Sequence, residues 1–372
     1  MEKNSNNPRI IALYLPQYHP FPENDEWWGK GFTEWTNVGR AKPVFKGHDQ
    51  PKVPTELGYY DLRLPIVREQ QAEMAREAGV EGFCYWHYWF GNGKQLLNEI
   101  IDEVISTGKP DFPFCFGWAN HSWSAKNWNR KDTSIKDKLL IEQTYPGDED
   151  IRKHYEYVLK AFKDKRYLTQ EGKPIFLVWN PKDMPSNFIT LWQKWSKEDG
   201  FPGVYFIANV DVMDKTDYIE TKGFDAIYYK RAQAICTSIL RHSDNFNIWN
   251  FIKSRIKLYI FKKPAMCFEY SDAIPFFKDD KVDIKENIIP GLVPNFDHSP
   301  RSKQFGFILN NSTPKLFYKH CKQIFNLVSK KRNKLVFLRS WNEWGEGNYM
   351  EPDIQYGRGY IDALREALNE DN

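Results

Sequence analysis

Residues 335–352 read LVFLRSWNEWGEGNYMEP, and this stretch indicates both the fold and the position of a site. It opens with four apolar residues, which is typical of a strand buried on both faces, and then turns into Trp, Asn, Glu and Gly. Gly345 and Gly347 would let the backbone turn sharply and a ligand approach closely. We interpret the stretch as a strand end that opens into an active site. The alternative, a Glu-rich surface turn, would have no reason to gather Trp341, Trp344 and Tyr349.

This stretch contains three carboxylates within nine residues, at Glu343, Glu346 and Glu351. A carboxylate beside an indole ring is poorly solvated, so it holds its proton more tightly than it would in water. Such an environment lets one carboxyl of a pair serve as an acid while the other stays ionised. The pattern therefore predicts a catalytic pair of glutamates.

Short apolar runs recur along the whole chain, and segments with helical spacing lie between them. Helices are expected from Pro65, from Pro314 to Ser329 behind a Ser-Thr cap, and from Gly359 to Leu368. Strands that alternate with helices favour a single (β/α)₈ TIM-barrel domain over residues 1–372 with long strand-to-helix loops, although a doubly wound sheet is the alternative. The expected strands are Arg9–Leu15, Val80–Trp86, Phe112–Trp118, Pro174–Asn180, Gly203–Asn209, Phe224–Tyr229, Pro290–Asn295 and Lys334–Trp341, the seventh being the weakest.

Active sites on this barrel lie at the carboxyl ends of the strands, and those ends carry aromatic, amide and acidic side chains. Flat rings with hydrogen-bonding groups suit a ligand ring that bears many hydroxyls, although each group could also be a satisfied polar residue at the barrel rim. The Trp-rich loop 24–35 is expected to fold over the barrel mouth, and a separate hydrophobic cluster under that loop is the alternative. The candidate binding residues are Tyr14, Gln17, His19, Glu34, Trp35, Trp86, His87, Trp118, Asn120, Asp297, Arg301, Trp341, Asn342 and Glu351.

Composition narrows the classes of function. The chain has 372 residues and a formal net charge of +3, so it does not suggest nucleic acid as a partner. Its aromatic content of 16% fits either a sugar-binding cleft or an aromatic-rich core. The five cysteines are odd in number and widely spaced, and the amino terminus reads as neither a signal peptide nor a membrane span, so a reducing cytoplasm is expected.

No pattern in the sequence predicts a metal or a cofactor. The eight histidines lack the spacing of zinc ligands, and no Gly-x-Gly-x-x-Gly follows a strand. The only Asp-x-Asp, at residues 148–150, falls where a helix is expected to start, and acidic residues are ordinary there. The apolar and basic segment Asn247–Lys263 is expected to be a helix packed on the barrel, with peripheral contact to an anionic membrane surface as the alternative.

Several motifs resemble the glycosyltransferase WbsX family across nearly the whole chain. They are ALYLPQYH (residues 12–19), WWGKGFTEW (27–35), YDLR (60–63), GFCY (82–85), WAN (118–120), WNEWGEG (341–347) and EP (351–352). That family is linked with gene clusters for O-antigen and other surface polysaccharides. It is also similar to glycoside hydrolase family 99, the endo-α-mannosidases, which are (β/α)₈ barrels.

The resemblance implies roles for the two glutamates. In the family 99 motif Asn-Glu-Trp-His-Glu, the first Glu helps the sugar 2-hydroxyl attack its own anomeric carbon, and the second is the general acid. These roles map onto Glu343 and Glu346, respectively. This chain departs from the hydrolases at Gly345, where they have His, and from the usual WbsX pattern at His121-Ser122, where that pattern reads Glu-Asn.

Three functions remain open at this stage. The first is a retaining glycosidase that cleaves a bond in a surface polysaccharide, an O-antigen or a lipid-linked precursor. The second is a glycosyltransferase or transglycosylase, which needs an activated donor or must exclude water from an intermediate. The third is a non-catalytic glycan-binding barrel. The sugar, the linkage and the oligomeric state are not predictable from the residues.

Overall fold

A computed structural model describes residues 7–125, 138–211, 216–231 and 266–370, together with residues 256, 260 and 264. Its centre is a sheet of parallel strands whose residues are almost all buried. The parallel strands are β1 (Arg9–Tyr14), β2 (Gly82–Trp89), β4 (Phe114–Trp118), β8 (Lys173–Val178), β9 (Tyr205–Val210), β10 (Ala226–Tyr229), β12 (Ile288–Ile289), β13 (Gly291–Leu292) and β16 (Leu335–Leu338).

The sheet curls into a nearly closed barrel. Its hydrogen-bonded order is β12-β10-β9-β8-β4-β2-β1-β16-β13, and every neighbouring pair along this path is parallel. Strand β12 pairs with β10, whereas β13 pairs with β16, so the five residues 288–292 connect the two edges. Pro290 lies between the two short strands and has no N–H to donate, which explains why the seventh position of the barrel is divided. The predicted α/β barrel is therefore confirmed.

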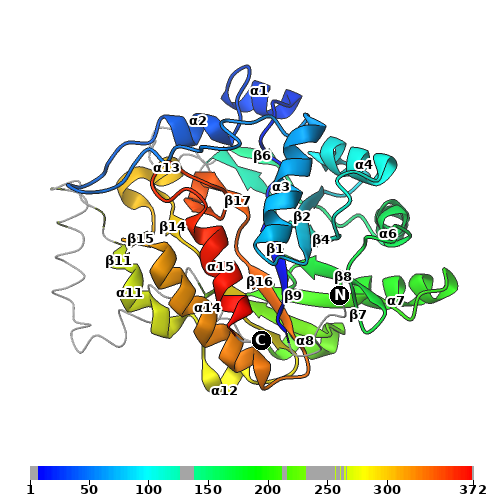
Figure 1. Ribbon diagram of the computed structural model, residues 1–372. Helices are drawn as coiled ribbons and strands as arrows, with labels where there is room; N and C mark the ends of the chain where they lie inside the picture. The colour runs from blue at the N-terminus through cyan, green and yellow to red at the C-terminus, as the bar shows by residue number, and fades with distance from the viewer. Residues whose placement is uncertain are drawn as a thin grey trace.

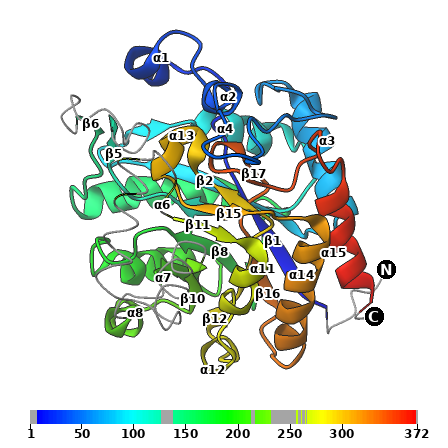
Figure 2. The ribbon, with the colours of Figure 1, turned by 90° about the vertical axis from the view of Figure 1, so that its left-hand side faces the viewer.

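Helices surround the sheet, as Figures 1 and 2 show. Helix α14 begins at Pro314 with Thr313 as its cap, whose side chain accepts a hydrogen bond from the Leu316 N–H at 3.3 Å. The helices are α1 (Pro22–Trp28), α2 (Glu34–Gly39), α3 (Pro65–Glu77), α4 (Asn98–Thr107), α6 (Asp148–Phe162), α7 (Phe188–Glu198), α8 (Asp217–Lys222), α11 (Tyr270–Ala273), α12 (Asp280–Asp283), α13 (Ser299–Ser302), α14 (Pro314–Ser329) and α15 (Gly359–Asn369). The described part of the chain also has 3₁₀ turns at η1 (Ile274–Phe276), η2 (Lys303–Phe305) and η3 (Trp344–Glu346).

The loops at the carboxyl ends of the strands carry small sheets of their own. A three-stranded sheet of β11 (Cys267–Glu269), β15 (Ile308–Asn310) and β14 (Phe296–Asp297) has a separate apolar core that includes Tyr270, Phe277 and Phe296. This sheet supports α13 between β14 and β15. The remaining short strands are β3 (Gln95–Leu96), β5 (Trp123–Ser124), β6 (Leu139–Ile141), β7 (Thr169–Gln170), β17 (Asn342–Glu343) and β18 (Asn348–Tyr349).

The Trp-rich loop after β1 folds over one end of the barrel, as expected. Helices α1 and α2 lie at that end together with α13 and β17, at the top of Figure 1. The indole of Trp35 packs between Tyr18, Tyr60 and Trp344, with ring centroids 4.6, 5.0 and 5.6 Å away. The loop thus closes the mouth and also forms an aromatic cluster that is continuous with the main core.

The strand boundaries differ from the predictions by one to three residues, and two of these differences have a clear structural cause. Strand β2 runs three residues beyond the expected Trp86, because its last two residues pair with β3 in an antiparallel hairpin. The expected strand Pro290–Asn295 is instead β12 and β13, which end at Leu292. The helical start at Asp148 is confirmed.

Three other predictions concern membrane spans, cysteines and the segment Asn247–Lys263. Among the described residues no helix is both long and apolar enough to cross a bilayer. Cys84, Cys115 and Cys321 are buried free thiols, and Cys267 is a half-buried one. The predicted helix Asn247–Lys263 lies outside the described residues, apart from Ile256 and Ile260.

Candidate active site

A short hairpin at the carboxyl end of β16 carries the two glutamates. Residues Asn342 and Glu343 of β17 pair antiparallel with Tyr349 and Asn348 of β18, and the turn η3 lies between them. Gly347 ends this turn at a φ of 51°, in the left-handed region that favours glycine. The prediction that a buried strand ends here and gives way to a turn is therefore confirmed.

Both glutamates line a cavity of ≈ 310 Å³ at the mouth of the barrel. This is the size of a pocket for a small organic ligand. Its walls mix aromatic rings with charged groups, a composition that suits a ligand with flat apolar faces and polar substituents. The lining residues are Leu13, Leu15, Gln17, Trp86, Tyr88, Ala119, His121, Trp123, Trp179, His298, Arg301, Arg339, Ser340, Glu343 and Glu346.

One guanidinium joins the acidic groups of this site. Arg301 on α13 donates from Nη2 to Glu343 Oε1 at 2.6 Å and from Nη1 to Glu346 Oε1 at 2.8 Å. Its Nε donates to Glu34 Oε2 at 3.1 Å. The Arg301 side chain is only 9% exposed, so these are charge-assisted hydrogen bonds with little competition from water.

The two lining glutamates have unlike electrostatic environments. Burial raises the pKa of Glu343 to about 8, with further contributions from Glu346 and Glu34, and Arg301 only partly offsets this. Burial also acts on Glu346, but Arg301, His298 and Arg339 together hold its pKa below the usual value. Arg339 Nη2 lies 3.3 Å from Glu346 Oε2, and His298 Nε2 lies 3.7 Å from Oε1. These surroundings therefore favour the protonated form of Glu343 and the ionised form of Glu346.

Gly345 leaves room for the carboxylate of Glu34, the third acidic group bound to Arg301. A Cβ atom at this position would lie 1.9 Å from Glu34 Oε2 and 3.0 Å from Arg301 Nε. Glu34 is fully buried, and burial raises its pKa although Arg301 opposes the shift. The carboxylate of Glu34 thus occupies the space that a side chain at 345 would fill.

Glu351 does not line the cavity but binds Trp344 in the hairpin that carries Glu343 and Glu346. Its Oε2 accepts from Trp344 Nε1 at 2.6 Å and from the Tyr60 hydroxyl at 2.9 Å, and its Oε1 accepts from Gln71 Nε2 at 2.6 Å. Burial raises the pKa of Glu351 to about 7, although these donors oppose the shift. Its position predicts support of the site through Trp344, which stacks on Tyr349 with centroids 3.7 Å apart.

Strand alternation explains why several candidates lie outside the cavity. Side chains along a strand point alternately to opposite faces, so Trp86 and Tyr88 face the barrel interior and His87 faces the helices. His87 Nε2 lies 2.9 Å from His154 Nε2 on α6, and burial lowers the pKa of His87. On β4, Gly117 faces inward against Trp86, whereas Trp118 points outward and donates to the Trp89 carbonyl at 3.0 Å.

Tyr14 and Asn342 are also structural in this geometry. Tyr14 faces α3, and its hydroxyl donates to Gln71 Oε1 at 2.7 Å. The Asn342 side chain is fully buried and binds both backbone groups of Leu15, accepting from its N–H at 2.8 Å and donating to its carbonyl at 3.0 Å. It thereby extends the pairing between β1 and β16 beyond the end of the barrel strands.

The other candidates outside the lining are used in packing and loop contacts. Asn120 Nδ2 donates to the Asn180 carbonyl at 2.8 Å, and its Oδ1 accepts from the Asn180 N–H at 2.7 Å. Trp35 Nε1 donates to the Tyr60 carbonyl at 2.7 Å. His19 and Trp341 are fully buried.

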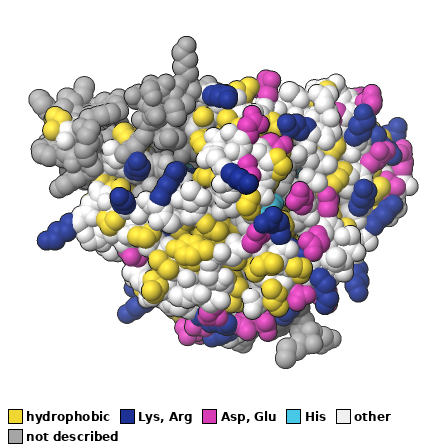
Figure 3. Space-filling view, turned by 90° about the horizontal axis from the view of Figure 1, so that it is seen from above, with side chains coloured by type: hydrophobic (Ala, Val, Ile, Leu, Met, Phe, Trp, Pro, Cys, Tyr) yellow, Lys and Arg dark blue, Asp and Glu magenta, His cyan; other side chains and the backbone are white. Residues whose placement is uncertain are grey.

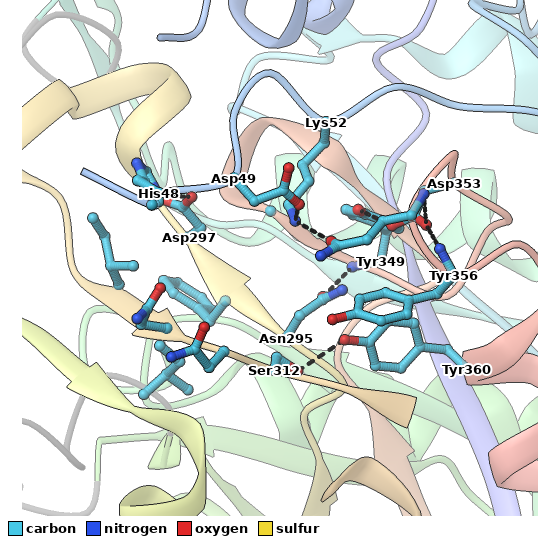
Figure 4. Close-up of a pocket in the computed structure, with 18 residues that line it drawn as sticks. His48, Asp49, Lys52, Asn295, Asp297, Ser312, Tyr349, Asp353, Tyr356 and Tyr360 are labelled. Carbon is cyan, nitrogen blue, oxygen red and sulfur yellow. Dashed lines mark hydrogen bonds and ion pairs between the residues drawn. The ribbon is translucent and has the colours of Figure 1, made fainter. Parts of the chain in front are cut away.

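Asp297 lines a separate cavity of ≈ 110 Å³ (Figure 4). There Asp297 Oδ2 lies 2.8 Å from His48 Nε2 and accepts from Gln50 Nε2 at 2.6 Å, and these contacts hold its pKa below the usual range despite burial. Figure 4 shows Tyr349 of β18 and Tyr360 of α15 on the side of this cavity opposite His48 and Asp297. The cavity is too small for a sugar ring. Asp297 instead holds the loop that contains His48 and Gln50.

Three of the predicted binding residues line the same cavity as Glu343 and Glu346: Gln17, Trp86 and Arg301. Gln17 is buried, and its Nε2 has no hydrogen-bond partner among the described residues, so a ligand hydroxyl can accept from it. The prediction omitted Tyr88, His121, Trp123, Trp179, His298, Arg339 and Ser340. Arg339 and Ser340 immediately precede the Trp-Asn-Glu motif, and alternation beyond Trp86 would have indicated Tyr88.

No group of three or more His, Cys, Asp or Glu side chains in the described ranges is arranged to hold a metal ion. The acidic groups of the cavity are instead bound to arginine.

Comparison with known proteins identifies relatives of this chain. The family described as Glycosyltransferase WbsX matches residues 10–364. The uncharacterised protein WxcX from two strains of Xanthomonas campestris pv. campestris is 33% identical over 370 residues. The match covers 96% of this chain and 49% of the relative, so the chain spans about half the length of WxcX.

Solved structures are similar to this chain in fold. A glycoside hydrolase-like protein superposes with a TM-score of 0.59 at 14% identity, covering 97% of this chain and 94% of the other. The GH99 endo-alpha-mannosidase from Bacteroides thetaiotaomicron, in complex with bis-tris-propane, gives a TM-score of 0.56 at 15% identity, covering 97% and 96%. At these identities the likeness shows the shared barrel.

Proposed function

The chain belongs to the WbsX glycosyltransferase family, a family of carbohydrate-active enzymes, and we propose that it cleaves a glycosidic bond with Glu343 and Glu346 as the catalytic pair. The proposed substrate is a surface polysaccharide, an O-antigen or its lipid-linked precursor. The observation that carries this proposal is the pair itself, because two carboxyl groups with opposite pKa shifts face one aromatic-walled cavity.

The arginine contacts favour Glu343 as the proton donor. Glu346 contacts both Arg301 and Arg339, and two guanidinium groups keep a carboxylate ionised. Glu343 shares Arg301 with two other carboxylates, so its proton is retained. This assignment reverses the roles that the family 99 resemblance implies, where Glu346 is the acid and Glu343 the base.

In the proposed reaction, Glu343 protonates the oxygen of the leaving sugar while the glycosidic bond breaks. Glu346 then acts as the base, either on a hydroxyl of the sugar itself or on water, and its charge also stabilises the positive charge that develops on the ring. Trp86, Trp123 and Trp179 supply flat faces for the sugar, and Gln17 supplies a hydrogen-bond donor.

The first test is product analysis by mass spectrometry in water enriched in ¹⁸O. The protein is incubated with polysaccharide and with its lipid-linked repeat, with and without nucleotide sugars. We expect shortened, labelled glycan without any nucleotide, and a loss of about 100-fold or more in Glu343→Gln and in Glu346→Gln. Glu366→Gln, an exposed change on α15, is the matched control and should keep full activity.

Two outcomes of this test would contradict the proposal. Lengthened, unlabelled glycan formed only with a nucleotide sugar would establish transfer, which the family description favours. Binding without turnover, unaffected by Glu346→Gln, would indicate a glycan-binding barrel.

A second test separates the acid from the base. Loss of a general acid is tolerated when the leaving group needs no proton, so aryl glycosides with an acidic phenol should be cleaved by Glu343→Gln far better than natural linkages. Glu346→Gln should lose activity on both kinds of substrate. If Glu346→Gln is the variant that recovers on aryl glycosides, the roles implied by the resemblance are right and the assignment from the arginine contacts is wrong.

A further inference from the structure

A basic cleft of ≈ 460 Å³ lies beside the catalytic cavity. Two segments form it, residues 40–44 after α2 and residues 299–304 of α13 and η2. Four of its lining residues are cationic, namely Arg40, Lys42, Arg301 and Lys303, and none of the described lining residues is Asp or Glu. The whole chain is nearly neutral at +3, and acidic and basic side chains are interspersed over the face in Figure 3, so this composition is a local excess of positive charge.

The cations on the outer side of this cleft are not neutralised within the described residues. Arg301 is bound by three glutamates, but no ion pair is made there by Arg40, Lys42 or Lys303, all of which are exposed. The Arg40 guanidinium donates only to the amide oxygen of Asn37. By comparison, the exposed Arg358 binds two glutamates. A cleft with several unpaired cations attracts an oxyanion.

The backbone of Lys303, in the lining of this cleft, is strained. Its φ of 52° and ψ of −131° lie in a region that favours glycine. Glycine would fit the turn at the end of α13 with less strain, but it would place no charge in the cleft. Strain retained at a charged residue in a cleft is typical of a functional site.

Arg301 is common to the linings of the cleft and of the catalytic cavity. A group bound in the cleft would therefore lie next to the same guanidinium that binds Glu343 and Glu346. A cleft of this size accommodates a phosphate, a diphosphate or a sugar acid.

We propose that this cleft binds an anionic group of the glycan substrate, a phosphate or a carboxylate, on the far side of Arg301 from the scissile bond. The inference rests on the proposed function and adds to it the charge of the substrate. Arg40, Lys42 and Lys303 are specificity residues in this scheme, since they select an acidic glycan without taking part in bond cleavage.

Isothermal titration of the full chain tests the cleft without any turnover. The probes are inorganic pyrophosphate and glucuronate, added to the wild-type protein, to Lys42→Ala/Lys303→Ala and to Lys160→Ala/Lys163→Ala. The last variant removes two exposed lysines at the end of α6 and is the matched control for net charge. We expect saturable binding of at least one probe, weakened about tenfold or more in the cleft variant and unchanged in the control.

Lys303→Gly separates binding from folding. It should relieve the backbone strain and keep or raise the melting temperature, yet weaken anion binding. Tight pyrophosphate with weak glucuronate would identify a phosphorylated or diphosphate-linked glycan, and the reverse would identify a uronic acid. Wild-type protein that binds neither probe, or equal binding by the cleft variant, overturns the inference and leaves cleavage of neutral glycans open. Anion binding without turnover of any glycan would instead count against the proposed function alone.

Discussion

Gly345 is the residue that makes room for Glu34, so the contact between Glu34 and Arg301 depends on it. A methyl group there would overlap the Glu34 carboxylate at 1.9 Å. We expect Gly345→Ala to lower the free energy of unfolding by about 2 kcal/mol and to reduce turnover strongly, because Arg301 would shift between its carboxylates. Urea unfolding and steady-state kinetics measure both effects.

A double-mutant cycle with Glu34→Ala controls this prediction. Removal of the Glu34 carboxylate opens the space, so the double variant should be more stable than the two single effects imply, by about 1 kcal/mol. Gly39→Ala, where an added Cβ meets nothing within 4 Å, is the neutral comparison. Simple additivity between positions 345 and 34 would show that the two side chains do not compete for this space.

Single residues should also set the pH dependence of cleavage. If Glu343 must be protonated, kcat/KM falls as pH rises through its pKa of about 8. Glu34→Gln removes a neighbouring negative charge and frees Arg301 for Glu343, and both effects lower the pKa of Glu343. The alkaline limb should therefore move to lower pH in this variant. An unmoved or upward-shifted limb in the pH–rate profile would mean that another group sets it.

The hairpin of β17, η3 and β18 is held to the barrel by a side chain that imitates backbone pairing. Asn342 binds both the N–H and the carbonyl of Leu15, so Asn342→Ala leaves two buried backbone groups unpaired. We expect a loss of roughly 2–3 kcal/mol in the free energy of unfolding, read from urea denaturation. Asn187→Ala removes an exposed asparagine that also makes one hydrogen bond, and should cost under about 0.5 kcal/mol. Equal losses in both variants would refute the anchoring role.

Stability of the whole molecule should decrease from weakly acidic to weakly alkaline pH. Burial raises the pKa of Glu343 to about 8 and of Glu351 to about 7. The folded state then binds more protons than the unfolded state above the unfolded pKa of about 4.5, so the free energy of unfolding falls as pH rises toward 8. Glu351→Gln should be less stable at every pH, because the amide replaces a carboxyl group that accepts three hydrogen bonds. In this variant the free energy of unfolding should fall less between weakly acidic and weakly alkaline pH, by up to about 3 kcal/mol. Urea unfolding at several pH values gives the slope, and an unchanged slope would contradict the prediction.

At the scale of the whole chain, hydrophobic runs were sufficient to predict the barrel and most of its strands. The seventh strand was predicted poorly because Pro290 divides it into two pairs of residues that bond to different neighbours. Within the site, the motif predicted Glu343 and Glu346, and the position after the seventh strand predicted Arg301; the cavity brings all three together. It could not distinguish Trp86 from His87, because only the register of β2 decides which of two adjacent residues faces inward. Glu34 was predicted as a ligand contact, and no local pattern could reveal its long-range contact with Arg301.

The sharing of Arg301 among three carboxylates has a consequence for inhibitor chemistry. A sugar analogue with a ring nitrogen that becomes an ammonium ion would place a positive charge beside Glu343 and drive its proton into solvent. Binding of such a compound would then be accompanied by proton release, and its affinity would rise with pH until the amine itself loses its charge. A neutral sugar of the same shape would show no such linkage, so comparison of the two compounds would report the protonation state of the site without any substrate being known.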